Sequence, residues 1–247
     1  MVLRPILWGG LPALLLLLVG FGGCSSGPNA EEILERSRAA MFQVQSYRWT
    51  GEHRQESIED GFRVRETGEW AGPDRWYHRL DFLERSGDYT DAELDIQEVM
   101  VVGGRVFHRN HRTEGAEWQE EFSSFPPGFQ THRNQAQSFL RPEHLTGVWL
   151  AGETVLKGSP VLLVRGETRE IRDLPPRGPE PPEGVGSVEF VSRLDWYISL
   201  ENHRLLRYEA ERQTIQAGQV TLTNWTDLDF HDYNQPVIIE VPEIVGD

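Results

Sequence analysis

Residues 30–52 read AEEILERSRAAMFQVQSYRWTGE, and the spacing of the apolar residues changes partway along them. From Ala30 to Gln43 the apolar side chains recur three and four residues apart and two acidic residues stand in the first turn, which predicts one amphipathic helix. From Ser46 onward apolar and polar residues alternate, which predicts a half-buried β-strand. The chain therefore begins with a helix and continues as strand.

Similar alternating segments recur along most of the remaining sequence, separated by turn residues such as Gly103-Gly104. Short connections of this kind imply antiparallel neighbours in a meander. Residues 123–150 do not alternate, and they predict a loop followed by short helices at about 135–140 and 142–149. We expect strands at about 46–57, 61–70, 75–84, 93–102, 105–110, 115–121, 151–157, 160–169, 187–200, 204–215, 218–230 and 237–241.

A proline-rich stretch at residues 174–186 interrupts the second run of strands. Its composition predicts an exposed, polyproline-like segment, either a linker between two domains or a long loop on one domain. The strands after it would form a sheet with an open edge on their own. We therefore expect a single domain over residues 31–247 with a surface loop at 174–186.

The chain has 247 residues and a formal net charge of −15, with 24 basic and 39 acidic residues. A charge this negative argues against a surface built to hold nucleic acid phosphates, and we expect no nucleic acid partner. One cysteine rules out an intramolecular disulfide, and His108 and His111 would point to different faces of a strand end, which disfavours a zinc site. No nucleophile elbow, metalloprotease helix or glycine-rich phosphate loop is present. We expect no catalytic residue, no metal and no cofactor, and hence no enzyme.

The first 23 residues have the pattern of an export signal: Arg4, an apolar run that includes Leu14–Val19, and small residues at the end. Glycines and a proline interrupt the apolar run, which disfavours the alternative of an uncleaved membrane-spanning helix. The only cysteine, Cys24, follows directly, and this arrangement resembles a bacterial lipoprotein signal. The resemblance implies that residues 1–23 are removed and that Cys24 carries acyl chains, palmitate among them. Residues 24–30 would then tether the protein to the extracytoplasmic side of the cell membrane.

Three further stretches carry a resemblance to a family, and the last is the most specific: residues 33–49, residues 195–206, and residues 230–242, which read FHDYNQPVIIEVP. Together with the order of elements, they resemble the LolA-like superfamily of lipoprotein carriers, and most closely the LppX/LprG lipoproteins. The resemblance implies a mainly β fold with α: a strongly curved antiparallel sheet, or half-barrel, of about 10–12 strands. Helices would cover its concave side over an apolar cavity that binds lipids or acyl chains.

Aromatic and aliphatic residues at strand positions that can face inward are the candidates for such a cavity. At each position the alternative is that the residue fills an ordinary core, since sequence alone cannot distinguish a closed core from a ligand cavity. Phe139, Leu145 and Trp149 are expected on the covering helices. The full set of candidates is Trp49, Trp70, Trp76, Leu80, Phe82, Met100, Phe139, Leu145, Trp149, Phe190 and Trp196.

Most arginines alternate with acidic residues, which favours cross-strand ion pairs on a solvated outer face. A clamp for a ligand's headgroup at the rim of the barrel is the alternative. The sequence thus predicts a membrane-tethered lipoprotein, monomeric, that binds or carries a lipid, glycolipid or acyl chain outside the cytoplasmic membrane. The alternative is an envelope sensor or scaffold that acts by protein contact, through its acidic surface, the proline loop and the Phe125/Phe129 segment.

Overall fold

The computed structural model describes residues 29–87, 96–110, 117–121, 135–140, 145–173 and 187–244. The predictions for residues 1–23, for Cys24, for the Phe125/Phe129 segment and for the proline loop 174–186 fall outside the described residues.

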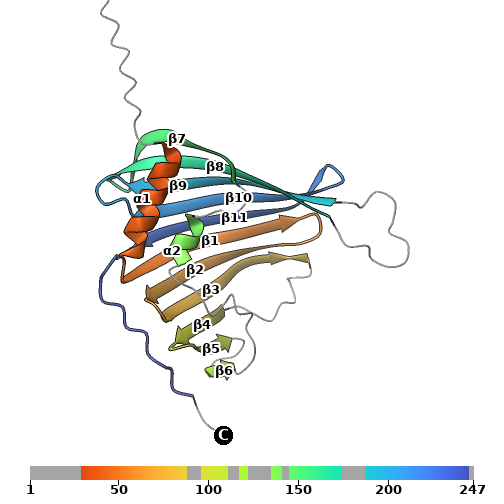
Figure 1. The fold of residues 1–247 in the computed structure, drawn as a ribbon. Coiled ribbons are helices and arrows are strands. Elements are labelled where there is room, and N and C mark those ends of the chain that lie inside the picture. The colour runs from red at the N-terminus through yellow and green to blue at the C-terminus, as the bar shows by residue number, and fades with distance from the viewer. Residues whose placement is uncertain are drawn as a thin grey trace, which may run out of the picture.

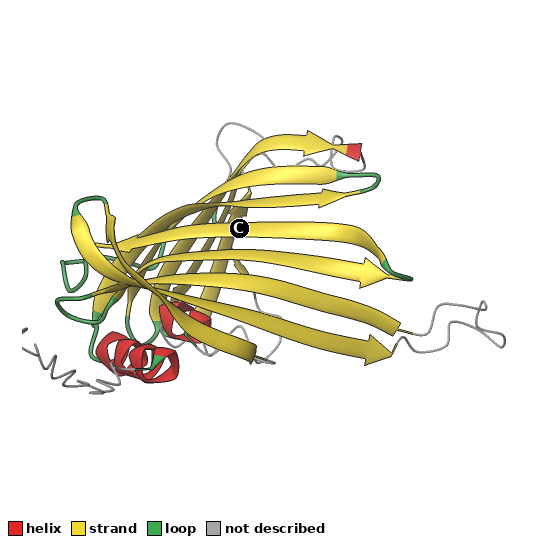
Figure 2. Ribbon diagram, turned by 90° about the horizontal axis from the view of Figure 1, so that it is seen from above, coloured by secondary structure: helices red, strands yellow, loops and turns green. Residues whose placement is uncertain are grey.

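The described strands form one antiparallel sheet that does not close into a barrel, in the order β6-β5-β4-β3-β2-β1-β11-β10-β9-β8-β7 (Figure 1). Both views show a strongly curved sheet with the two helices on its concave face (Figure 2). The predicted half-barrel with covering helices is confirmed. The strands are β1 (Ser46–Ser57), β2 (Gly61–Ala71), β3 (Arg75–Ser86), β4 (Ile96–Val102), β5 (Arg105–Asn110), β6 (Gln119–Glu121), β7 (Leu145–Leu156), β8 (Ser159–Asp173), β9 (Ser187–Ser199), β10 (Leu205–Gln216) and β11 (Gln219–His231).

Helix α1 (Ala30–Phe42) begins where the sequence predicts. The side chain of Asn29 caps it by accepting a hydrogen bond from the Glu32 amide at 2.7 Å. Its buried stripe includes Ile33, Leu34 and Met41, and this stripe packs onto the concave face of the sheet. None of the helices within the described ranges is long and apolar enough to cross a membrane.

The second helix is α2 (Gln135–Phe139), as predicted, but the helix expected at 142–149 is wrong. From Leu145 onward those residues belong to β7, an edge strand that pairs with β8. The pairing slips between Leu145 and Gly147 and again between Leu150 and Gly152. Because each slip interrupts the two-residue alternation, the apolar residues of β7 are spaced like those of a helix although the backbone is extended.

The strand predicted at 237–241 is also wrong, since these residues have no regular secondary structure. Both edges of β1 are already paired, with β2 and with β11. The segment just before 237–241 is instead fixed to the start of β1 by individual bonds. The Asn234 amide donates to the Ser46 carbonyl at 2.8 Å, and the Ser46 hydroxyl donates to the Gln235 carbonyl at 2.6 Å.

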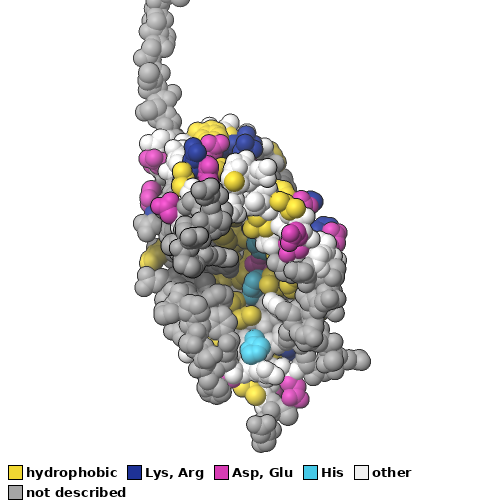
Figure 3. All heavy atoms as spheres, turned by 90° about the vertical axis from the view of Figure 1, so that its right-hand side faces the viewer, with side chains coloured by type: hydrophobic (Ala, Val, Ile, Leu, Met, Phe, Trp, Pro, Cys, Tyr) yellow, Lys and Arg dark blue, Asp and Glu magenta, His cyan; other side chains and the backbone are white. Residues whose placement is uncertain are grey.

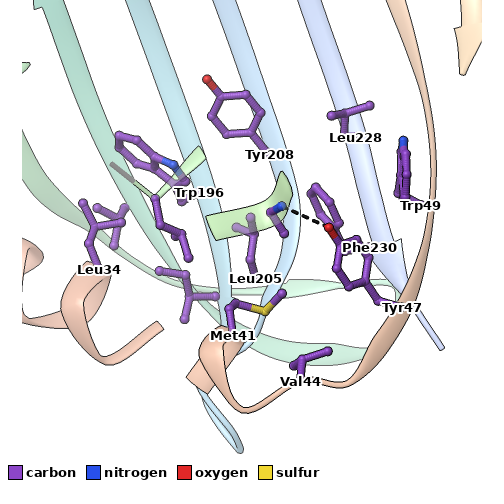
Figure 4. Packing of buried hydrophobic residues seen from close by; sticks show 14 of the residues in the cluster. Leu34, Met41, Val44, Tyr47, Trp49, Trp196, Leu205, Tyr208, Leu228 and Phe230 are labelled. Atoms are coloured by element: carbon purple, nitrogen blue, oxygen red, sulfur yellow. Dashed lines mark hydrogen bonds between the residues drawn. The ribbon is translucent and has the colours of Figure 1, made fainter. Parts of the chain in front are cut away.

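The hydrophobic core lies at the end of the half-barrel that the helices cover (Figure 4). Tyr47 and Trp196 are among its largest fully buried side chains, and Met41 and Leu205 pack in the same cluster. The phenol oxygen of Tyr47 accepts a hydrogen bond from the Ala136 amide at 3.1 Å, which fixes α2 to the sheet (Figure 4). The opposite end of the half-barrel, where β1 and β8 end, extends beyond both helices (Figures 1 and 2) and is called the open end below.

Candidate functional site

The cross-strand register assigns each side chain of the sheet to one of two faces. Trp49, Leu228, Tyr208 and Trp196 lie on the concave face, in strands β1, β11, β10 and β9. Their neighbours in sequence, such as Asp227, point to the convex face. The concave face carries the buried aromatic residues, and it is therefore the face on which a hydrophobic ligand would be sheltered from water.

A pocket of about 630 Å³ lies on this face beside α2 and toward the open end. This volume falls in the range of small-molecule sites, about 300–1,000 Å³. Seen from the open end, the protein is hollowed, with hydrophobic side chains and histidines inside the hollow (Figure 3). The pocket is lined by Ser138, Phe139, Thr168, Glu170, Arg172, Phe190, Ser192, Leu194, Tyr208, Ala210, Arg212, Asn224 and Thr226.

Helix α2 forms the wall between this pocket and the core. The ring of Phe139 stacks on that of Tyr208, with centroids 4.5 Å apart. The indole Nε1–H of Trp196 donates to the Phe139 carbonyl at 2.7 Å, so a core residue of the sheet holds the last turn of the helix. Burial raises the pKa of Tyr208 to about 12, so its phenol is neutral at physiological pH. The wall at this end of the pocket is thus aromatic and uncharged.

At the other end of the pocket the chemistry changes. Phe190, in β9, lies beneath two guanidinium groups: Arg172 of β8 with its Cζ 5.2 Å from the ring centroid, and Arg212 of β10 at 4.9 Å. Ser192 and Asn224 add polar groups to the same stretch of wall. The pocket therefore has an aromatic end at α2 and a cationic end toward the open end of the half-barrel.

Beside the pocket the concave face carries a buried carboxylate, Glu66 of β2, which is 2% exposed. It accepts a hydrogen bond from the indole Nε1–H of Trp49 at 2.6 Å and is paired with His53 and with His78, the latter at 3.0 Å. The other ring nitrogen of His53 lies 3.0 Å from the hydroxyl of Thr226, a residue that lines the pocket.

Burial alone raises the pKa of Glu66, but hydrogen bonds from His53 and His78, together with their charges, outweigh it and hold the pKa well below its usual range. Glu66 is therefore ionised although it lies in an apolar surface. The two imidazoles contact the carboxylate itself, and in the part of the chain that the structure describes no three His, Cys, Asp or Glu side chains are arranged to hold a metal ion.

The convex face is charged. Its arginines pair with carboxylates on neighbouring strands, as in Arg63–Glu52 at 2.8 Å and Arg109–Glu98 at 2.6 Å, so the predicted outer-face ion pairs are confirmed. Two grooves of about 660 and 650 Å³ lie on this face. Charged side chains dominate their lining, and a hydrocarbon chain placed there would remove water from many of them without returning hydrogen bonds. The concave pocket is therefore the better site for a hydrophobic ligand.

The eleven candidates from the sequence separate into groups. Phe139 and Phe190 line the pocket, whereas Trp49, Trp70, Trp76 and Trp196 are buried in the core on the same face. Leu80 and Phe82 are partly buried on the concave side of β3, opposite Glu66 and Val64. Leu145 lies on the concave side of β7, and its side chain reaches toward Gly166.

Two candidates are on the wrong face. Met100 pairs with Tyr77 of β3, one position out of step with the inward-facing Trp76. Trp149 pairs with Arg165 and lines the convex groove, 44% exposed. Neither contributes to the concave pocket, because in a strand a displacement of one residue reverses the face.

Tyr208, Leu194 and Ala210 in the pocket wall were not among the residues predicted from the sequence, and neither were Glu66 and Arg212. The wall residues alternate with charged ones along β9 and β10, so the two-residue period was a usable signal. Nothing in the sequence distinguishes Glu66 from the other acidic residues.

No protein-family model matches the sequence, and no curated protein matches it. Among solved structures the chain is similar to LprF from Mycobacterium bovis, with 13% sequence identity and a TM-score of 0.49. The similarity covers 86% of this chain and 96% of LprF. It is similar to the Mycobacterium tuberculosis lipoprotein LppX, with 12% identity, 85% and 98% covered, and a TM-score of 0.44. A LolA superfamily protein from Nitrosomonas europaea gives 11% identity, 86% and 96% covered, and a TM-score of 0.30. The groups that the sequence resemblance named are thus among these structures, and no function follows from similarity at this level.

Proposed function

We propose that the concave pocket binds the hydrocarbon part of a lipid, glycolipid or acylated molecule outside the cytoplasmic membrane. The observation that carries the proposal is the pocket of about 630 Å³ beside α2, with Phe139, Leu194 and Tyr208 in its wall. Transfer of a chain from water into such a wall contributes about 0.8 kcal/mol for each buried CH₂ group. No chemical step is required, and the protein acts as a binder or carrier without catalysis.

Release would follow from movement of α2. This helix has five residues, and the contacts that hold it to the sheet include the Ala136–Tyr47 and Trp196–Phe139 hydrogen bonds and the Phe139–Tyr208 stack. A single short turn of helix opens at lower cost than the long paired strands beneath it. In this proposal, Cys24 carries the lipid anchor and the protein works as a monomer at the membrane surface.

Native mass spectrometry of the full chain, purified from its own host in a non-ionic detergent, tests the proposal. We expect a bound species of lipid mass that organic extraction removes and added lipid restores. A chain that carries no adduct and takes up neither fatty acid nor monoacylglycerol would refute it. Trp225→Ala, on the convex face, is the control and should leave the adduct unchanged.

The convex groove supports a second candidate, contact with an envelope protein. Trp149 and Trp225 line it among charged residues, and partly exposed tryptophans in a polar rim are typical of protein interfaces. In that case Trp149→Ala would weaken binding to a purified partner while Phe139→Ala would not. No lipid probe would then bind the concave pocket.

A further inference from the structure

The cationic end of the pocket carries two arginines, Arg172 and Arg212, which the binding of a hydrocarbon chain does not require. Many arginines on the sheet are paired with carboxylates, as expected in a chain with a net charge of −15. Arg212 is different: it lies over Phe190 and forms no ion pair with any residue in the described ranges. A cation left without an anion, on the concave face of a strongly acidic protein, is available to a ligand.

Arg172 completes the arrangement from the other side of Phe190. It pairs with Glu170, two residues away on the same strand, with one Nη–Oε distance of 3.0 Å. The Arg172 side chain is 59% exposed, so a ligand at the open end can reach its guanidinium, while Glu170 is 18% exposed and holds that guanidinium by two hydrogen bonds. Stacking on the Phe190 ring restrains both guanidiniums, which reduces the entropy lost when they bind an anion.

Apart from Glu170, the polar residues beside these arginines are hydrogen-bonding groups without charge. Thr168 and Ser192 pair across β8 and β9, and Ser192 pairs with Arg212 across β9 and β10, so the three lie in one row. Asn224 pairs with Arg212 on its other side, in β11. All of them line the pocket whose other end is the aromatic wall at α2.

We infer that this pocket takes an anionic amphiphile whose phosphate headgroup binds Arg172 and Arg212 and whose hydrocarbon chain points toward Phe139 and Tyr208. Planar guanidiniums bind phosphate oxygens through two parallel hydrogen bonds, and the hydroxyl and amide groups of the row bind the remaining oxygens. The inference rests on the proposed function. It adds to that function the chemical class of the ligand's headgroup and the position of the headgroup, at the open end.

The test compares two ligands that differ only in the phosphate: oleoyl lysophosphatidic acid and monoolein. Each is titrated into the full chain in non-ionic detergent at low salt, and bound fractions are read by native mass spectrometry. We expect the phosphorylated lipid to bind about tenfold more tightly, which is typical of charge-assisted hydrogen bonds at a partly solvated site. The preference should fall as salt is added.

Variants separate the site from the overall charge. Arg212→Gln and Arg172→Gln should each remove most of the preference and leave monoolein binding unchanged. Arg212→Lys keeps the charge but lacks the planar fork, and it should retain only part of the preference. The matched control is Arg169→Gln, which removes a cation from the convex face of β8, where Arg169 pairs with Glu189 at 2.7 Å. It should retain the full preference, and the Tm of each variant reports whether it is folded.

The other possible results of the lipid titrations would overturn either the headgroup site or the proposed function. Equal binding of the two lipids would overturn the headgroup site and leave the hydrocarbon pocket standing, whereas binding of neither would refute the proposed function itself. Loss of the preference in Arg169→Gln as well would assign it to net charge and overturn the site. Glycerol phosphate alone distinguishes the source of the anion: if it bound as tightly as the phosphorylated lipid, the arginines would serve a soluble phosphate ester and the amphiphile would be excluded.

Discussion

The indole of Trp49 packs against Gly68, its direct cross-strand partner, and a Cβ atom at Gly68 would overlap the ring. The absent side chain brings the indole close to β2, where its Nε1–H reaches Glu66 at 2.6 Å. The same device recurs on the other half of the sheet, where a Cβ atom at Gly166 would lie 2.8 Å from the Trp196 ring. Two glycines thus set the position of the tryptophans that hold the buried carboxylate and helix α2.

Gly68→Ala should lower the free energy of unfolding by about 3 kcal/mol, because it displaces the indole and leaves Glu66 with one hydrogen bond fewer. Equilibrium urea unfolding, followed by tryptophan fluorescence, measures the change. Gly147→Ala is the matched control, since nothing lies within 4 Å of a Cβ atom at that position. If the two substitutions lowered the free energy of unfolding equally, the close approach of Trp49 to Gly68 would not contribute to stability.

The low pKa of Glu66 predicts a pH dependence of stability. Burial raises this pKa, and the hydrogen bonds from His53 and His78 lower it by more. Because the pKa is lower in the folded state, the stabilisation is fully present above the unfolded pKa of about 4.3 and is lost as the pH falls below it.

Glu66→Gln should therefore lower the free energy of unfolding by about 2 kcal/mol at pH 6 and make its decrease between about pH 5 and pH 3 shallower than in the unaltered chain. Urea midpoints across this range measure both effects. Glu153→Gln, at an exposed position in β7, should change neither. An unchanged slope in Glu66→Gln would mean that other carboxylates dominate the acid sensitivity.

Trp196→Phe removes the N–H donor that binds the Phe139 carbonyl. We expect faster hydrogen exchange of the α2 amides and a loss of about 1 kcal/mol in the free energy of unfolding, because a partly buried acceptor loses its partner. Hydrogen–deuterium exchange with mass spectrometry resolves the helix from the sheet. Trp225→Phe, on the convex face, should leave exchange in α2 unaltered; equal protection of α2 in both variants would contradict the proposed clamp.

Filling the pocket should weaken ligand binding without unfolding the protein. Ala210 lines the concave pocket between Leu194 and Thr226 in the register, and a phenyl ring there would occupy the space of the chain. Ala210→Phe should weaken binding of a fluorescent fatty-acid probe by more than about tenfold, while the thermal midpoint moves by a few degrees at most. Ala151→Phe, at an exposed position in β7, is the size-matched control. Probe binding unaffected by Ala210→Phe would place the ligand elsewhere.

The sequence predicted the sheet because most strands alternate strictly, as in Trp76, His78 and Leu80 of β3. It failed at β7, where slips in register leave the apolar residues of 145–149 at helical spacing. The site was less predictable than the fold. Arg212 resembles every other arginine in an alternating strand until β8, β9 and β10 are paired, and only that pairing brings it to Phe190.

The pairing of β1 with β11 has a consequence for how the protein is made. Among the described strands, the first and the last lie side by side in the middle of the sheet, while its two edges, β6 and β7, follow one another in sequence with α2 between them. Each half of the sheet is a meander that can form from local contacts, but the seam between the halves joins residues far apart in the sequence, such as Arg48 and His231. During synthesis, β1 therefore keeps one edge unpaired until β11 emerges. A chain that stops before β11 exposes two unpaired strand edges at its centre, and such products are the ones a cell's quality control must remove.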